Sequence, residues 1–322
     1  MLYRRILLSL LFVCVYSCSF AGIFIVTSKA DAGAGTLRDA LTKAAANGSG
    51  QKDFINFNLP GASEADRTIT LESELPILPA NIVIDGTTQA GIKFGVSGSK
   101  VKVVNTYGIG PNVNAIFKGD NSGDIEIAGL FILSGNGQSA LYMTKSNNVF
   151  IHHCLVFKST VTVTFCKKFT FSNNMVGLDA TGTTFNEGGV SAFDIDNIII
   201  GGSPTAGNLI NSDIRLGNTY RSADWQYLVS YNKVATDYSG TKSYLTYNTP
   251  ARIHVSNGGP TTNPSGQMHG TISNNLVANV SSYGIFAEGT GDALIQANTV
   301  NTDKTGTVDF SKFDPDGAQG ST

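Results

Sequence analysis

The chain alternates short apolar segments with clusters of asparagine, glycine and serine, and this pattern recurs along its length. A six-residue motif has apolar residues at its first and last positions and an asparagine at its fourth position. Clear copies occupy residues 171–176, 229–234, 272–277 and 295–300, and weaker copies occupy residues 127–132 and 151–156. Short apolar segments bounded by turn-forming residues predict strands joined by sharp corners.

The fourth position of the motif predicts a row of stacked asparagines. Asparagine tolerates the left-handed backbone conformation of a tight corner, and its amide can hydrogen-bond to an equivalent amide one repeat away. The asparagines concerned are Asn174, Asn208, Asn232, Asn275 and Asn298. Successive spacings are 34, 24, 43 and 23 residues. We interpret the longest spacing as two repeats, with a degenerate copy around Ile253 and Ser256 between them.

These repeats predict an all-β fold, a right-handed parallel β-helix spanning residues 67–302. The repeats lack the leucine pattern and the helical half of leucine-rich repeats, so each is expected to form one coil of strands. Further strands are predicted at 68–71, 81–85, 100–104 and 115–118. The handedness follows from the general rule for parallel crossover connections.

A short amphipathic helix is predicted to cap the N-terminal end of this solenoid. Thr36 can cap its start, the apolar residues of 37–44 fall on one face, and Gly48 ends it. We assign residues 22–66 to this strand and capping helix. Residues 303–322 form a polar tail, which we interpret as the start of a linker or of a further C-terminal region.

The first 21 residues have the pattern of a secretory signal peptide. Arg4 and Arg5 precede an apolar run over residues 6–16, and small residues follow it. The run is too short to span a bilayer, so no transmembrane segment is predicted. We therefore expect a secreted or cell-surface protein. Lipid attachment at Cys18 is the alternative.

Composition excludes several classes of protein. Of the 322 residues, 36 are glycine and only 14% are charged, which argues against disorder and against long helices. The net charge is −2 and no basic run occurs, so no nucleic-acid partner is expected. Cys154 and Cys166 remain after the signal, and we expect them to be buried and unpaired rather than disulfide-bonded. No metal site or cofactor is indicated, and a monomer is expected.

The N-terminal region resembles a family of secreted bacterial proteins. Gly35, Thr36, Leu37, Arg38, Asp39 and Ala40 are similar to the cysteine–serine–leucine–arginine–glutamate–alanine cap of parallel β-helix proteins common in the Bacteroidetes group. The segments at 54–61, 68–78 and 82–91 extend the resemblance. It implies a pectin-lyase-like fold, export and a C-terminal sorting or anchoring domain. The resemblance does not imply any one enzymatic activity.

An aromatic segment between Tyr220 and Tyr247 is the strongest local indication of a binding site. Aromatic rings stack against sugar faces or anchor protein partners, and neighbouring charged groups can hydrogen-bond to hydroxyls. The candidate ligand-binding residues are Tyr220, Arg221, Asp224, Trp225 and Tyr227. The alternative is that several of these rings only pack a lateral loop against the solenoid.

A catalytic site is a second hypothesis. Parallel β-helices that cleave acidic polysaccharides use carboxylates to hold calcium and a basic side chain to remove a proton. Asp194, Asp196, Arg215 and Arg252 are the candidates, and calcium enters only under this hypothesis. His152 and His153 lie within a repeat and have no third metal ligand at useful spacing, so we interpret them as corner residues.

The sequence thus favours an extracellular module that adheres to surfaces or binds a polysaccharide, a cell-surface glycan or another surface protein. The alternative is a polysaccharide lyase, or a hydrolase or epimerase, acting on an acidic glycan. A structural spacer is a second alternative.

Overall fold

The computed structural model describes residues 20–107, 115–134, 139–243, 252–257, 266–278, 283–289 and 291–310. Residues 1–19 of the predicted signal sequence, Tyr244, Tyr247 and most of the predicted polar tail lie outside these residues. Within the described part of the chain, no helix has the length and apolar character that a bilayer span requires.

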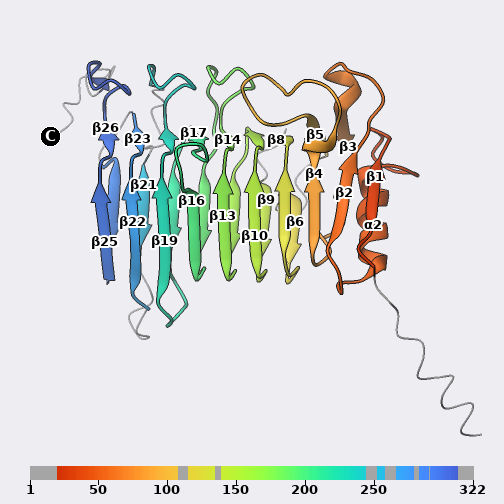
Figure 1. The fold of residues 1–322 in the computed structure, drawn as a ribbon, viewed down its shortest axis with the longest axis horizontal. Coiled ribbons are helices and arrows are strands. Elements are labelled where there is room, and N and C mark those ends of the chain that lie inside the picture. The colour runs from red at the N-terminus through yellow and green to blue at the C-terminus, as the bar shows by residue number, and fades with distance from the viewer. Residues whose placement is uncertain are drawn as a thin grey trace, which may run out of the picture.

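The chain folds as a right-handed parallel β-helix built from three parallel sheets, as the sequence predicts. From β4 to β24 each coil contributes one strand to each sheet, and each strand pairs with its equivalents in the neighbouring coils (Figure 1). Sheet A has ten strands, sheet B nine and sheet C seven among the described residues. Nine strands stacked about 4.8 Å apart make a rod roughly 40 Å long.

Sheet A contains the longest row of strands. In chain order its strands are β1 (Ile23–Val26), β2 (Asp53–Phe57), β4 (Ile82–Asp85), β7 (Ile125–Ala128), β10 (Asn148–His152), β13 (Lys168–Ser172), β16 (Asn197–Gly201), β19 (Trp225–Ser230), β22 (Met268–Ser273) and β25 (Gly291–Gln296).

Sheets B and C complete each coil. Sheet B contains β3 (Thr68–Leu71), β5 (Val101–Asn105), β8 (Leu130–Ser134), β11 (Leu155–Phe157), β14 (Met175–Val176), β17 (Leu209–Ile210), β20 (Lys233–Val234), β23 (Leu276–Val277) and β26 (Thr299–Val300). Sheet C contains β6 (Ala115–Asp120), β9 (Ser139–Thr144), β12 (Val161–Thr164), β15 (Val190–Phe193), β18 (Ile214–Gly217), β21 (Ile253–Ser256) and β24 (Ile285–Glu288).

The predicted asparagine ladder forms the corner between sheets A and B. The backbone N–H and the side-chain amide of Asn174 both donate to Oδ1 of Asn208, at 2.9 and 3.2 Å. The same pair of bonds links Asn208 to Asn232, Asn232 to Asn275, and Asn275 to Asn298. Each amide also donates to a carbonyl of a neighbouring strand, as Asn208 does to Phe171 at 2.9 Å. The ladder therefore satisfies buried polar groups that this corner would otherwise leave without partners.

One prediction about the repeats is wrong. Asn232 bonds directly to Asn275, so the 43-residue interval between them is a single coil. Residues Ile253–Ser256 form β21 in sheet C and are no copy of the corner motif. The interval is long because this coil has long connections between its strands. A spacing of 43 residues fits two short coils as well as one extended coil, so the sequence spacing does not distinguish them.

Alternate residues of each strand fill the interior. In β12, Val161 and Val163 are buried while Thr162 and Thr164 face outward. Their inward side chains join one core that continues from coil to coil. Burying each such side chain contributes about 1.5–3 kcal/mol, which explains the two-residue periodicity.

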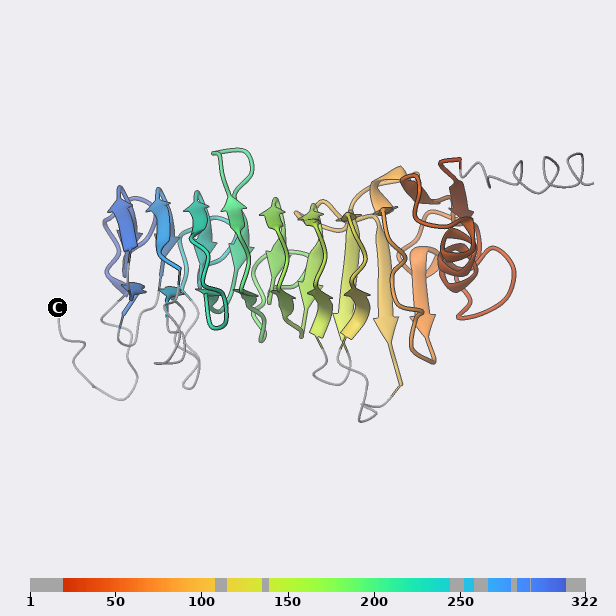
Figure 2. The same cartoon turned by 90° about the horizontal axis from the view of Figure 1, so that it is seen from below.

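The helix α2 (Leu37–Asn47) closes the N-terminal end of the rod (Figures 1 and 2). The Thr36 side chain accepts a hydrogen bond from the backbone N–H of Asp39, and Gly48 ends the helix. Leu37, Ala40, Leu41 and Ala44 are its buried residues, as predicted. Two short 3-10 turns, η1 (Ala65–Arg67) and η2 (Gly86–Thr88), follow in the connections of the first coils.

Candidate functional site

A groove of about 520 Å³ runs along the asparagine corner. Its floor is formed by the residues that directly precede the ladder positions. His153, Asn173 and Tyr231 all have positive φ there, at 55°, 56° and 61°. The equivalent residue before Asn208 is Gly207, whose Cβ would lie 2.0 Å from the carbonyl oxygen of Tyr231. Only glycine therefore fits at this coil, because the backbone of the next coil lies directly against it.

The opposite side of the groove includes residues 93 and 96–98 and parts of two hairpins, Tyr238 and Ser239 from one and Lys304 from the next. These hairpins and a third one share a sequence motif. The motif is aspartate, any residue, serine or threonine, glycine and threonine, starting at Asp179, Asp237 and Asp303. In the second copy, Oδ1 of Asp237 accepts hydrogen bonds from the backbone N–H groups of Thr241 and Lys242, at 2.8 and 3.0 Å. The first and third copies make equivalent bonds. The aspartate thus closes each hairpin from within.

The hairpins follow strands β14, β20 and β26, which belong to every second coil. They nevertheless contact one another, because the backbone N–H of Tyr238 donates to Gly182 at 2.9 Å and that of Lys304 donates to Gly240 at 3.0 Å. A hairpin is two strands wide, about 9.6 Å, which equals the height of two coils. One hairpin on alternate coils therefore builds a continuous wall, seen as the row of green, teal and blue loops along the upper edge in Figure 1.

The groove is positively charged. Lys93, Lys233, Lys304 and His153 line it, and none of its lining residues is an aspartate or a glutamate. This contrasts with the whole chain, in which 24 acidic residues outnumber 22 basic ones. Two carboxylates lie close by and offset part of this charge: Asp237 acts on Lys233, and Asp85 acts on His153. The lining of the groove therefore carries only basic groups, and the carboxylates that offset them lie behind it.

Two of these groups have shifted pKa values. Burial lowers the pKa of the Lys233 ammonium group, and the nearby Lys304 lowers it further. Lys233 Nζ donates to the carbonyl oxygen of Tyr238 at 2.6 Å and lies 5.3 Å from the centre of the Tyr238 ring. Burial also lowers the pKa of His153, and the charge of the neighbouring His152 lowers it further. An anion in the groove would stabilise the charged form of both groups.

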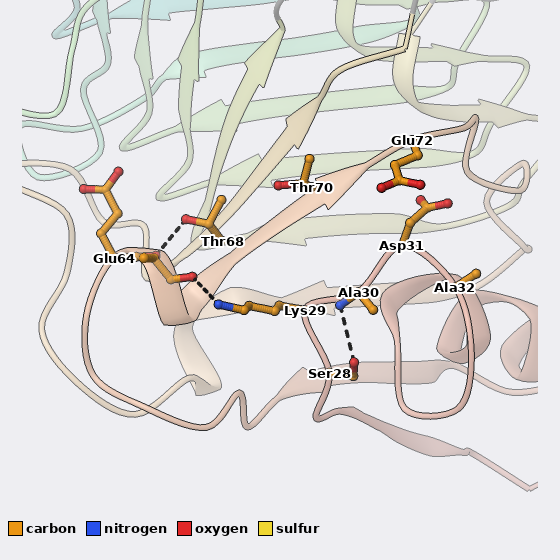
Figure 3. A pocket seen from close by; sticks show the side chains of 10 residues that line it. Ser28, Lys29, Ala30, Asp31, Ala32, Glu64, Thr68, Thr70 and Glu72 are labelled. Atoms are coloured by element: carbon orange, nitrogen blue, oxygen red, sulfur yellow. Dashed lines mark hydrogen bonds between the residues drawn. The ribbon is translucent and has the colours of Figure 1, made fainter.

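A second depression, of about 1050 Å³, lies at the N-terminal end of the rod (Figure 3). It is lined by residues 28–32, Glu64 and the outer face of β3. Its carboxylates are largely paired, since Asp31 contacts Arg38 at 2.7 Å and Glu64 contacts Lys102 at 2.6 Å. Lys29 donates to the carbonyl oxygen of Ala65. The corner groove is the better candidate because its charges are not paired in this way.

The structure separates the candidate residues of the catalytic hypothesis. Asp194 follows the sheet C strand β15, and its Oδ1 accepts the backbone N–H groups of Thr219 and Tyr220. Asp196 pairs with Arg221. Arg215, within β18, and Arg252, just before β21, instead converge on Asp213, at 3.7 and 3.5 Å. The two aspartates therefore contact the 219–221 loop, whereas the two arginines contact Asp213.

The aromatic segment is divided between the core and the surface. Trp225 and Tyr227 are inward residues of β19, only 2% and 4% exposed, so they belong to the core and are not available to a ligand. The alternation of a strand requires this, since Val229 faces inward as well. Tyr220 is 71% exposed, and Arg221 and Asp224 lie at the surface loop beside it. Tyr231 and Tyr238 line the groove.

Apart from His153, which lines the groove, the histidines contact neighbouring side chains, and both described cysteines are buried. Nδ1 of His152 lies 2.8 Å from Nδ1 of His153, and His254 and His269 face Glu288 and Asp292 across neighbouring strands. Cys154 and Cys166 are buried and free, as predicted. Among the described residues, no three histidine, cysteine, aspartate or glutamate side chains are grouped in a way that could hold a metal ion.

Sequence reasoning missed the hairpin wall. Its signal was the motif that starts at Asp179, Asp237 and Asp303, which recurs at intervals of 58 and 66 residues. These intervals are about twice the length of one coil. The motif therefore shows a second periodicity of two coils, superimposed on the asparagine repeat.

Comparison with known proteins adds no relative to this description. No protein-family model, no curated protein and no solved structure matches the chain.

Proposed function

We propose that the protein is an extracellular β-helix module that binds a linear acidic polysaccharide along the asparagine corner. The observation that carries the proposal is the groove lined by three lysines and one histidine, with no carboxylate among its lining residues. A charged groove of this kind favours a ligand of opposite charge. The predicted signal sequence and the resemblance of the N-terminal cap to secreted bacterial β-helix proteins support an extracellular location.

The shape of the groove supports an extended ligand. From His153 to Tyr231 the floor crosses three coil steps, or roughly 14 Å. The hairpin wall runs parallel to this floor, so a linear chain can lie along the rod axis. Tyr231 and Tyr238 supply rings for sugar contacts, while Ser97, Ser239 and Asn173 supply hydrogen-bonding groups.

Affinity electrophoresis with polygalacturonate in the gel tests this proposal. We expect polygalacturonate to retard the protein and dextran to leave it unretarded. The variants Lys93→Gln and Lys304→Gln should each weaken binding about fivefold, because a lost charge contact near the surface is worth about 1 kcal/mol. Added salt should also weaken binding.

Lys168→Gln is the matched control. Lys168 is as exposed as Lys93 and Lys304 but lies on the outer face of sheet A, away from the groove. The Lys168→Gln variant should bind polygalacturonate like the wild-type protein. Equal losses in all three variants would indicate general charge attraction, and no retardation in polygalacturonate would refute the groove as a site for acidic polysaccharides.

A polysaccharide lyase is the second candidate function, and the lowered pKa of Lys233 favours it. A lysine with a depressed pKa can provide the neutral amine that removes a proton beside a carboxylate. Turnover of polygalacturonate would raise the ultraviolet absorbance through the unsaturated product, and Lys233→Ala would abolish the rise. A flat trace with folded, binding-competent protein eliminates this candidate.

A further inference from the structure

An exposed pair of aromatic rings lies at the opposite edge of sheet A, at the corner between sheets C and A. Phe165 follows β12 and Tyr220 follows β18, and their ring centres are 6.1 Å apart with an angle of 28° between the ring planes. Phe165 is 43% exposed and Tyr220 is 71% exposed. We call this pair the aromatic platform. It is separate from the groove, which follows the corner between sheets A and B.

The platform is held in place by a buried carboxylate. Phe165 and Tyr220 belong to coils two steps apart, and Asp194 occupies the corner of the coil between them. Oδ1 of Asp194 accepts the backbone N–H groups of Thr219 and Tyr220, both at 2.8 Å. These bonds draw Tyr220 back across the intermediate coil toward Phe165. Asp194, predicted as a candidate catalytic residue, therefore positions the platform.

Arg221 fixes the loop from its other side. Its Nη1 donates to the carbonyl oxygens of Asp194 and Cys166, at 3.0 and 3.3 Å, and its guanidinium pairs with Asp196. Asn218 and Arg221 also exchange two hydrogen bonds at 3.0 Å. The loop is thus ordered before any ligand arrives, which lowers the entropic cost of binding.

The backbone at Phe165 is unfavourable for the residue that occupies it. Phe165 has φ of 54°, in the left-handed region, and Asn121, Lys145 and Asp194 occupy the equivalent corner in neighbouring coils. Asparagine and aspartate enter this region readily, whereas a bulky aromatic residue does so at a cost. The solenoid imposes this conformation at the same corner of successive coils, so the backbone does not call for an aromatic residue here, and the exposed ring is available to a ligand.

We propose that the aromatic platform is a second carbohydrate site, which binds the apolar face of an uncharged sugar ring. The two rings provide an apolar surface, and the paired Arg221 and Asp196 beside it offer donors and acceptors without an excess of either charge. This chemistry fits a neutral polyol better than an acidic glycan. The platform and the groove would then recognise different parts of a mixed polysaccharide, or two different chains.

Affinity electrophoresis in gels containing galactomannan, xyloglucan or hydroxyethylcellulose tests the platform. We expect at least one of these neutral polysaccharides to retard the wild-type protein, and Tyr220→Ala to weaken that binding about tenfold. Phe165→Asn should weaken it similarly while leaving the urea unfolding midpoint unchanged or raised, since asparagine suits the left-handed corner. Binding of polygalacturonate should not change in either variant.

Tyr283→Ala is the matched control. Tyr283 is 60% exposed and its ring is stacked against Phe286, but it lies away from the platform. The Tyr283→Ala variant should bind the neutral polysaccharide as strongly as the wild-type protein does. Absence of retardation in all three neutral gels, equal loss in Tyr283→Ala, or a lowered unfolding midpoint in Phe165→Asn would overturn the proposal. In the last case Phe165 would be a structural residue. If the wild-type protein bound a neutral polysaccharide but not polygalacturonate, the groove would be refuted as an acidic site and the platform proposal would stand.

Discussion

At the scale of single residues, the corner between sheets A and B depends on amides that both donate and accept. The side chain of Asn208 accepts two hydrogen bonds from Asn174, and it donates one to Asn232 and one to the carbonyl of Phe171. It is only 2% exposed, so water cannot replace these partners. The same arrangement explains why the motif places an asparagine and no other polar residue at the fourth position.

Replacing this amide should destabilise the protein. Asn208→Ala leaves the backbone N–H of Asn174 and the carbonyl of Phe171 buried without their partners, and we expect a loss of about 3 kcal/mol in the free energy of unfolding. Urea denaturation followed by circular dichroism measures it. Asn147→Ala, at an exposed asparagine, should change stability by less than about 0.5 kcal/mol. Equal stability of the two variants would contradict the structural role of the ladder.

At the scale of elements, the three hairpins are separate units built on one aspartate each. Burial alone would raise the pKa of Asp237, but hydrogen bonds from the Ser239 side chain and from three backbone N–H groups outweigh it and lower the pKa. The pKa of Asp303 is lowered to about 2, first by the Thr305 side chain. The charged form of each aspartate therefore stabilises its hairpin.

The hairpins should loosen in acid. Because the folded pKa lies below the ordinary value of 3.8, this stabilisation is complete above 3.8 and is lost as pH falls through the folded pKa. Amide hydrogen exchange of Thr241 and Lys242, corrected for intrinsic rates, should rise between about pH 5 and about pH 2. In Asp237→Asn the exchange should be faster at neutral pH and independent of pH over this range. Unchanged wild-type exchange would contradict the role of the carboxylate.

At the scale of the whole molecule, one continuous core runs along the rod and encloses both described cysteines. Burial raises the pKa of the Cys154 thiol to about 12 and that of Cys166 to about 11. The thiolate is the reactive form, so both groups should be inert while the coils remain stacked. Their reactivity therefore reports the opening of the solenoid.

Thiol labelling should follow global unfolding. At neutral pH in native buffer we expect no reaction of Cys154 or Cys166 with an alkylating reagent, and complete reaction of both across the urea transition seen by circular dichroism. Mass spectrometry of the labelled peptides distinguishes the two sites. Rapid labelling of either residue in native buffer would show that its coil opens locally, which a solenoid permits in principle.

The sequence by itself determined the coils, the asparagine corner and the N-terminal cap. These features depend on residues close together in the chain, such as the alternation around Phe171 and the cap at Thr36, and the hydrophobic and corner preferences of a single coil specify them. The same alternation applies to β19, but the sequence does not say which of its two faces points inward. The register of β19 against β22 places Trp225 on the inward face.

Only the tertiary structure decided which residues share a surface. Stacking brings Tyr220 against Phe165 and Lys304 against the hairpin of Asp237, although long stretches of chain separate them. The number of residues in each connection sets which coils become neighbours, and the 43-residue interval after Asn232 shows that this number varies widely. The groove and the platform follow from that stacking, because each is assembled from side chains of several coils.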